Sequence, residues 1–461
     1  MQNPNRRQML RSSAAIGAGI MSGSALNTGT ANAASESYAG KSSNQGNPAA
    51  HGPQFTPHRN SDFGHNILFM DEYHKGTMEL LGRLSGETGH IGELSSRAVS
   101  VINNGGTVWT SMNIGHMPSH EQKETRRGGP GIMKDHSDFE SLKKGDLLIT
   151  NQCSKDVLAA RDRGVYVVSV TVNYIDNEFR PDDFTNKNED GLMLADVSNE
   201  ILHSHVPYYQ GLVHAPEIPE TTLCPSTTTG LGALHWMLNA EIANKLADNK
   251  AKDVDKSDEY LRILTERVKM LTQYRGRIIE TAQAMTDRII DGGRWFVRSI
   301  EHPGLESELH GVASGPMIVN YGDWDAKKDK NVMLINAISP SHPDEVKLAM
   351  EKQLEGAYVI GVGPCSVDGD VPPGRLIDVA DSGFSNLSPE SGGVIKIKKR
   401  DGTICPTSGI IGNIIQQMIC AQWTDEMLRT GHTPYFWMGF FQNGGQPYDD
   451  GIRMFFERQG F

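Results

Sequence analysis

The chain has 461 residues, of which 38% are hydrophobic and 22% are charged, and its formal net charge at pH 7 is −12. This acidic balance excludes the basic footprint of a nucleic-acid-binding protein and offers no basic patch for a membrane surface. There are five cysteines, an odd number with no disulfide-framework spacing, so a structural disulfide remains an alternative rather than the expectation.

Residues 1–33 contain the parts of a twin-arginine export signal in their usual order. Asn5–Arg11 holds the arginine pair, a weakly apolar stretch follows, and Ala31–Ala33 is a small-residue cleavage site. The alternative is a basic, disordered terminus. The apolar stretch is too short and too rich in Gly and Ser to span a bilayer, so no stable membrane insertion is expected. We expect the twin-arginine export machinery as a partner, a flexible linker at 34–64, and a periplasmic or extracellular protein.

Four blocks of sequence occur twice, in the same order. They are Asn104–Trp109 and Asp291–Val297, Asp146–Asn151 and Asn331–Asn336, Gly164–Val170 and Gly356–Val362, and Cys224–Thr227 and Cys405–Ser408. Repeats this far apart indicate a duplicated domain, because solenoid repeats are only about 20–50 residues long. The sequence therefore predicts two similar domains, 65–250 and 258–461, that pack as a pseudo-dimer.

Within each copy, short apolar runs alternate with helical patterns. Leu147–Ile149 and Val165–Val168 are apolar runs bounded by Gly or polar residues, while Leu261, Leu264 and Val268 share one helical face. This alternation is typical of an α/β fold, with a parallel sheet that helices cover on both faces. Ligands of such sheets bind beyond the carboxyl ends of the strands. We expect them at loops 110–121, 151–155 and 224–229 and at the equivalent loops 298–308, 337–344 and 405–409.

These loops resemble those of the sugar isomerase (SIS) domain. Thr110–His116 is similar to the family's G-x-G-H loop, with Asn113 in place of the first glycine, and Cys224–Thr229 is similar to its Ser/Thr-rich stretch before the last helix. Thr433–Met438 is strand-like, and a Gly-rich loop and helix follow, as in single-domain members. The resemblance implies two flavodoxin-like domains and a small-molecule ligand, either a sugar or a sugar phosphate.

The resemblance also implies an aldose–ketose isomerase, which needs a base to move a proton and an acid to assist the carbonyl oxygen. Glu121 is the candidate base and His116 the candidate acid, while the second copy offers Glu306, with Glu308 and His302 close in sequence. The alternative is that these carboxylates are solvated acids at helix N-termini. The candidate substrate-binding residues are Ser111, Asn113, Ser154, Ser226, Thr227, Thr228, Ser339, Ser341, Thr407 and Ser408.

Both copies depart from the family's phosphate loop, S-x-S-G-x-[TS]. The first has Asn151–Lys155, with one hydroxyl, and the second has Ser339–Pro343, with two prolines that remove backbone donors. An unphosphorylated sugar is therefore a natural substitute, and a non-catalytic carbohydrate-binding protein is the main alternative to an isomerase.

A third hypothesis is a metal-dependent sugar-processing enzyme, because histidines cluster in the first copy: His116, His120, His203, His205, His214 and His235. A His/Glu set could hold zinc, and His203–His205 would place both imidazoles on one face of a predicted strand. Pro118 argues against a helical pair of His116 and His120, and His235 fits a core position. We therefore predict no cofactor, with zinc as the alternative, and leave a homodimer open.

Overall fold

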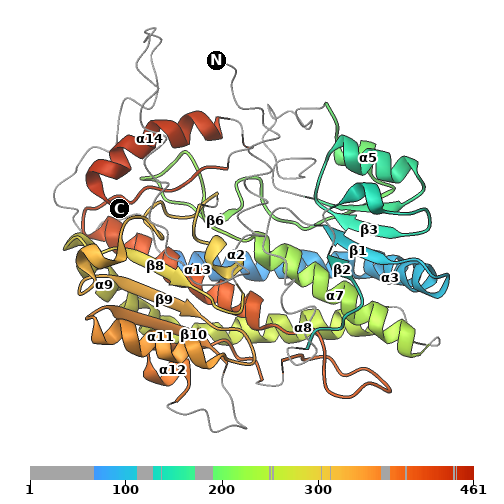
Figure 1. The fold of residues 1–461 in the computed structure, drawn as a ribbon. Coiled ribbons are helices and arrows are strands. Elements are labelled where there is room, and N and C mark those ends of the chain that lie inside the picture. The colour runs from blue at the N-terminus through green and yellow to red at the C-terminus, as the bar shows by residue number, and fades with distance from the viewer. Residues whose placement is uncertain are drawn as a thin grey trace. The chain divides into compact units, whose positions relative to one another are not determined.

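Two parallel sheets, one in each half of the chain, form the frame of the fold (Figure 1). The computed structural model describes residues 67–111, 128–135, 138–171, 191–248, 251, 254–302, 304–311, 313–364, 374–389, 392–439, 442 and 444–461. All of these residues belong to one unit, Gly52–Phe461.

The first sheet has the order β2-β1-β3-β4-β5, which is the flavodoxin-like strand order. Its strands are β1 (Val108–Ser111), β2 (Lys134–Asp135), β3 (Leu147–Thr150), β4 (Tyr166–Val170) and β5 (Glu200–Leu202). The second sheet has the order β11-β10-β9-β8, formed by β8 (Trp295–Arg298), β9 (Val332–Asn336), β10 (Tyr358–Gly363) and β11 (Ser382–Ser385). A parallel bridge from Trp295 to Val319 takes the place of β2, so the second sheet repeats the order of the first.

Each copy opens with two consecutive helices and ends with a long one. The opening pairs are α2 (Phe69–Leu84) with α3 (Thr88–Asn103), and α8 (Asp255–Met270) with α9 (Arg275–Ile290). The closing helices are α7 (Thr227–Ala247) and α13 (Ser408–Arg429). The remaining elements of four residues or more are α5 (Lys155–Asp162), α6 (Leu194–Val197), α10 (Gly304–Ser307), α11 (Pro343–Leu354), α12 (Leu376–Val379), α14 (Gly445–Gln459), and the 3-10 turns Leu271–Tyr274 and Trp324–Lys327.

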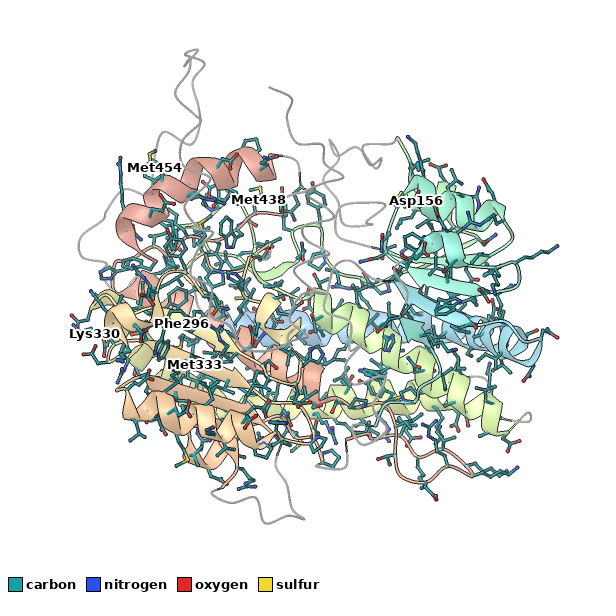
Figure 2. The ribbon with its side chains drawn as sticks, viewed as in Figure 1. Asp156, Phe296, Lys330, Met333, Met438 and Met454 are labelled. Carbon is teal, nitrogen blue, oxygen red and sulfur yellow. The ribbon has the colours of Figure 1, made fainter. Side chains whose placement is uncertain are left out.

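Helices cover both faces of each sheet, as the apolar runs predicted. In β3, Leu147 and Ile149 face the large core that includes α3 and α7, whereas Leu148 faces the smaller core beneath α5. In the second sheet, Phe296 and Met333 belong to the cluster formed with α11 and α12 (Figure 2). Because successive strand residues point to opposite faces, a continuous apolar run is needed to fill both cores.

Equivalent hydrogen bonds occur in both copies. The Thr107 N–H donates to the Asp146 carboxylate at 2.9 Å, and the Arg294 N–H donates to the Asn331 side-chain oxygen at 2.9 Å. Asp146 immediately precedes β3 and Asn331 immediately precedes β9, and each ties its strand to the residue before the neighbouring strand, β1 or β8. The predicted α/β class with two parallel sheets is therefore confirmed, whereas the domain limits 65–250 and 258–461 stay predictions.

Contacts between the copies are reciprocal. Helix α2 of the first copy packs against α13 of the second, and α8 of the second packs against α7 of the first. The Cys224 N–H donates to the Ser314 carbonyl oxygen, and the Cys405 N–H donates to the Gly128 carbonyl oxygen, both at 2.8 Å. In an isologous, two-fold interface each partner makes the same contacts to the other, as these two copies do.

Two local predictions were wrong. Strand β5 ends at Leu202, so His203–His205 lies outside it. Thr433–Met438 is not a regular strand: its pairing is the single antiparallel bridge from Phe436 to Pro316, flanked by a 2.9 Å bond from the Trp437 N–H to the Gly315 carbonyl oxygen. The predicted helix after it is present as α14. Within the described ranges, no helix combines the length and apolar character needed to cross a membrane.

Candidate functional site

The switch point of the second sheet lies between β8 and β9. The chain leaves β8 toward the bridge at Val319 and leaves β9 toward β10, on the opposite side. Loops that diverge in this way open a crevice at the carboxyl ends of the strands, where ligands of open α/β sheets bind. The residues that follow β8 and β9 are therefore the candidate site in the described part of the chain.

Glu306 lies at this crevice, on the short helix α10. Its Oε1 accepts a 2.8 Å hydrogen bond from the Ser299 N–H, the first backbone donor after β8, and its Oε2 lies 4.0 Å from Arg298 Nη1. The side chain remains 29% exposed. Burial raises the pKa of Glu306, although Ser299, Arg298 and His310 act in the opposite direction. A partly buried carboxylate with a raised pKa is suited to take and return protons near neutral pH.

A second pair joins the two loops of the crevice. His342 Nε2, after β9, lies 3.5 Å from Glu301 Oε1, after β8. His342 Nδ1 accepts from the Asp344 N–H at 3.2 Å, so a neutral ring carries its proton on Nε2 and directs it toward Glu301. Sequence reasoning missed this pair and named His302 and Glu308, which are both fully buried.

Amide side chains of α13 form hydrogen bonds to the segments that line the crevice. Asn336, the last residue of β9, donates to Gln416 Oε1 at 3.0 Å, and Gln416 donates to the Leu305 carbonyl oxygen at 3.0 Å. A Cβ at Gly412 would lie 2.5 Å from Asn336 Oδ1, so any larger residue there would displace the Asn336 amide. Gln416 therefore links β9 to the segment that carries Glu306. The sequence signal was a cluster of amides, Asn413, Gln416 and Gln417, in an otherwise apolar helix.

The loops that resemble the family's phosphate site have their helix N-termini capped by side chains. Ser154 Oγ accepts from the Val157 N–H at 3.3 Å, and Asp156 stands in the first turn of α5 (Figure 2). In α11, His342 is the cap, and the Glu345 carboxylate accepts from the His342 N–H at 3.0 Å. Carboxylates and caps at a helix N-terminus compete with a bound anion for the same donors and the same dipole. The geometry of both loops therefore disfavours phosphate.

The remaining predicted binding residues fall into two groups. In the first copy, Ser111 Oγ accepts from Gln152, and Ser226 and Thr227 donate to Gln210 at 2.8 and 2.7 Å, so these hydroxyls hold the protein itself together. The buried hydroxyls without a hydrogen-bond partner among the described residues include those of Thr228 and Ser339. Ser341 is half-buried beside Ser339, and Thr407 and Ser408 are buried at the start of α13. Glu121, His116 and Asn113 lie outside the described residues.

Of the first-copy histidines that the structure describes, His203 and His205 lie beside Glu87, whereas His214 pairs with Glu72. His205 Nε2 lies 3.1 Å from Glu87, and His90 contacts both Glu87 and Glu200. Across the residues that the structure places, no group of three or more His, Cys, Asp and Glu side chains is arranged to hold a metal ion. The zinc hypothesis therefore depends on His116 and His120, which lie outside those residues.

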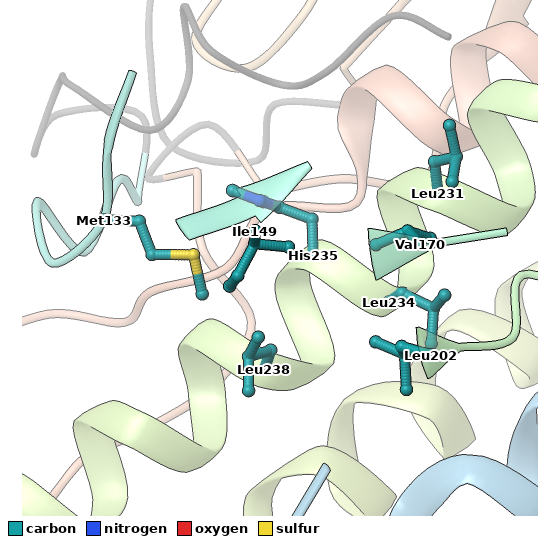
Figure 3. Close-up of a pocket in the computed structure, with 8 residues that line it drawn as sticks. All are labelled: Met133, Ile149, Val170, Leu202, Leu231, Leu234, His235 and Leu238. Atoms are coloured by element: carbon teal, nitrogen blue, oxygen red, sulfur yellow. The ribbon is translucent and has the colours of Figure 1, made fainter. Parts of the chain in front are cut away.

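His235 is a core residue, as predicted. It lines an apolar cavity of about 10 Å³ between α7 and the first sheet, together with Met133, Ile149, Val170, Leu202, Leu231, Leu234 and Leu238 (Figure 3). One ring nitrogen lies 3.0 Å from Asn239 Nδ2. Burial lowers the pKa of His235 to about 4, so the ring is neutral at pH 7 and unsuited to proton transfer there.

No protein-family model matches the chain, and no curated protein matches its sequence. Among solved structures, it is similar to a candidate phosphosugar isomerase from Silicibacter pomeroyi (TM-score 0.43, 12% identity, 80% of this chain and 100% of that one). A candidate sugar-binding protein from Salmonella typhimurium gives a TM-score of 0.42 at 12% identity, over 77% and 100% of the two chains. The C-terminal domain of a Francisella tularensis glucosamine-fructose-6-phosphate aminotransferase gives 0.41 at 9% identity, over 82% and 99%. TM-scores below 0.5 decide neither the family nor the function of this chain.

Proposed function

We propose that this chain is an exported tandem sugar-isomerase-domain protein that interconverts aldose and ketose forms of a carbohydrate derivative. The family part of the proposal rests on the resemblance of loops Thr110–His116 and Cys224–Thr229, and it is consistent with two flavodoxin-like strand orders. The export part rests on the arginine pair and cleavage site within residues 1–33.

The observation that carries the activity is the environment of Glu306. In the proposed reaction, its carboxylate takes the proton from C2 of the open-chain aldose and returns it to C1. The Glu301–His342 pair donates a proton to O1, the aldehyde oxygen, and accepts one from the O2 hydroxyl, because His342 presents its Nε2 proton at the same crevice. Glu121 and His116 are proposed for the same roles in the first copy.

The loops after β3 and β9 fit an unphosphorylated part of a ligand better than they fit the phosphate group of a sugar phosphate. Both helices that would face the phosphate carry acidic first turns and side-chain caps. A non-catalytic carbohydrate-binding protein is the second candidate, and the same capped loops favour it.

The test is solvent-deuterium incorporation. The protein is incubated in D2O with a panel of aldoses and ketoses, and C1 and C2 are followed by NMR. Turnover of one pair with deuterium at these carbons is expected, with loss of incorporation in Glu306→Gln but retained ligand-induced thermal stabilisation. Glu351→Gln, on the exposed face of α11, is the matched control. Stabilisation by a sugar without incorporation in the wild type would instead establish a binding protein.

A further inference from the structure

Arg267 of α8 reaches the start of the closing helix α13. Its Nη1 donates to Thr407 Oγ1 and lies 3.5 Å from Ser388 Oγ, and the two hydroxyls lie 3.2 Å from each other. Ser388 and Thr407 are almost fully buried. Ser388 follows β11, so this group lies at the carboxyl edge of the second sheet, as Glu306 does.

Arg267 is partly buried, and burial lowers the pKa of its guanidinium. Among the described residues, no carboxylate forms an ion pair with it. Helix α13 has no acidic residue in its first turn, and its Thr407 cap makes no side-chain capping bond. A partly desolvated guanidinium thus meets the positive end of a long helix dipole. This arrangement is unfavourable unless an anion lies between them.

The first copy has no such charge. Tyr73 and Tyr260 make the same hydrogen bond in the two copies, to Pro225 and Pro406, and so define equivalent positions on α2 and α8. About two turns further along, the first copy has the buried Leu80 where the second has Arg267. The position that leucine occupies in the first copy is therefore occupied by arginine in the second. Since the first copy folds with leucine there, the fold does not require the charge.

We propose that Arg267, Ser388 and Thr407 bind the anionic group, a carboxylate or a phosphate monoester, of the carbohydrate derivative. This inference rests on the proposed function and names its substrate class. A guanidinium offers parallel N–H donors that match either anion, and the hydroxyls and the α13 N-terminus add further donors. The site differs from the phosphate-type loops after β3 and β9, whose helix ends are capped.

The sheet also indicates the size of the ligand. Glu306 lies beside β8 and Ser388 beyond β11, at opposite ends of four adjacent strands. With strands spaced about 4.8 Å apart, roughly 14 Å separates these two ends. The anionic group is therefore remote from the reacting carbons, which fits an acidic disaccharide better than a hexose acid.

The experiment uses the full chain and paired probes: glucuronate and glucose, glucose 6-phosphate and glucose, a uronate disaccharide and its neutral counterpart, and inorganic phosphate. Affinity is measured by calorimetry and thermal shift. Wild type is expected to prefer the anionic member, most strongly for the disaccharide, and Arg267→Leu to weaken anion binding at least tenfold while sparing the neutral member. Arg267→Lys should be intermediate. Arg262→Leu, on the exposed face of the same helix, should change nothing.

Without ligand, Arg267→Leu should raise the melting temperature, because it removes a partly buried charge and restores the residue type of Leu80. Equal binding of charged and neutral probes by wild type, or unchanged anion affinity in Arg267→Leu, would overturn the anion site. This conclusion would not depend on the result for Glu306→Gln. Stabilisation of wild type but not of Arg267→Leu by inorganic phosphate, with no response to any carbohydrate, would keep the anion site and refute the carbohydrate function.

Discussion

The hydroxyl group of Tyr73 donates a 3.1 Å hydrogen bond to the carbonyl oxygen of Pro225, and in the second copy Tyr260 does the same to Pro406 at 2.9 Å. Each bond ties an opening helix to the segment that enters a closing helix. The cysteine before each proline has a positive φ, 63° in Cys224 and 59° in Cys405, which L-residues adopt rarely. Both halves of the chain therefore have the same strained backbone together with the hydrogen bond beside it.

Removing this hydroxyl should cost similar stability in both copies. We expect Tyr73→Phe and Tyr260→Phe each to lower the free energy of unfolding by about 1 kcal/mol, since each leaves a buried carbonyl oxygen without its donor. Chemical denaturation measures the change, with the exposed Tyr321→Phe as a control. A loss in one copy and none in the other would contradict the equivalence of the two positions.

Much of the fold could be predicted from residues that repeat. Asp146 and Asn331 differ in charge, yet each accepts a hydrogen bond from the backbone N–H just before the neighbouring strand. The two blocks that contain them are therefore similar in sequence. The predicted strand at His203–His205 is absent, because β5 ends at Leu202 and the backbone of His205 has a positive φ. Local pattern predicts an alternation of side chains but not where the chain turns.

The candidate site was only partly predictable. Sequence placed Glu306 in a loop after a strand, and the structure places it after β8 on the short helix α10, where burial raises its pKa. The Glu301–His342 contact joins two loops, and Arg267 meets Thr407 from another helix, so both depend on tertiary packing that no local spacing encodes. The burial of Glu308 likewise follows from α13, whose Gln417 donates to its carbonyl oxygen at 2.9 Å.

His235 should make stability depend on pH. Its folded pKa of about 4 lies below the ordinary value of 6.5, so the unfolded chain binds the proton first. This contribution to stability is fully present above pH 6.5 and is lost as pH falls toward 4, by roughly 3 kcal/mol. Of the neighbouring charges, Asp135 acts to raise this pKa, against the larger effect of burial.

The measurement compares wild type and His235→Gln by denaturation at pH 4, 5, 6 and 7. Glutamine keeps a polar side chain but does not titrate, so the difference between the two proteins should shrink as pH falls. A difference that is constant with pH would show that His235 has the same pKa in the folded and the unfolded chain, as a solvent-exposed ring does.

Cys224 and Cys420 should be inert thiols in the folded protein. Both are fully buried, and burial raises the pKa of Cys224, with the hydrogen-bonded Cys420 thiol adding to the effect. Since the thiolate is the reactive form, alkylation by iodoacetamide should spare both residues and label the half-buried Cys153 faster. Peptide mapping before and after denaturation tests this. Rapid labelling of Cys224 in the native protein would refute the close packing of α13 against the first copy.

Asp449 should act on stability in the direction opposite to His235. Burial raises its pKa to about 7 from 3.8, although the Met438 N–H donates to it at 2.8 Å and Arg453 lies near. A raised folded pKa means that its stabilising contribution is complete below about pH 4 and is lost as pH rises through 7. Asp449→Asn keeps an acceptor for Met438 and cannot ionise, so its melting temperature should match wild type at pH 4 and exceed it at pH 8. Asp450→Asn, on the exposed side of α14, should show no such crossover. If Asp449→Asn were the less stable protein at pH 8, the carboxylate would be a favourable charge, and the packing of α14 around it would have to be more open than the structure shows.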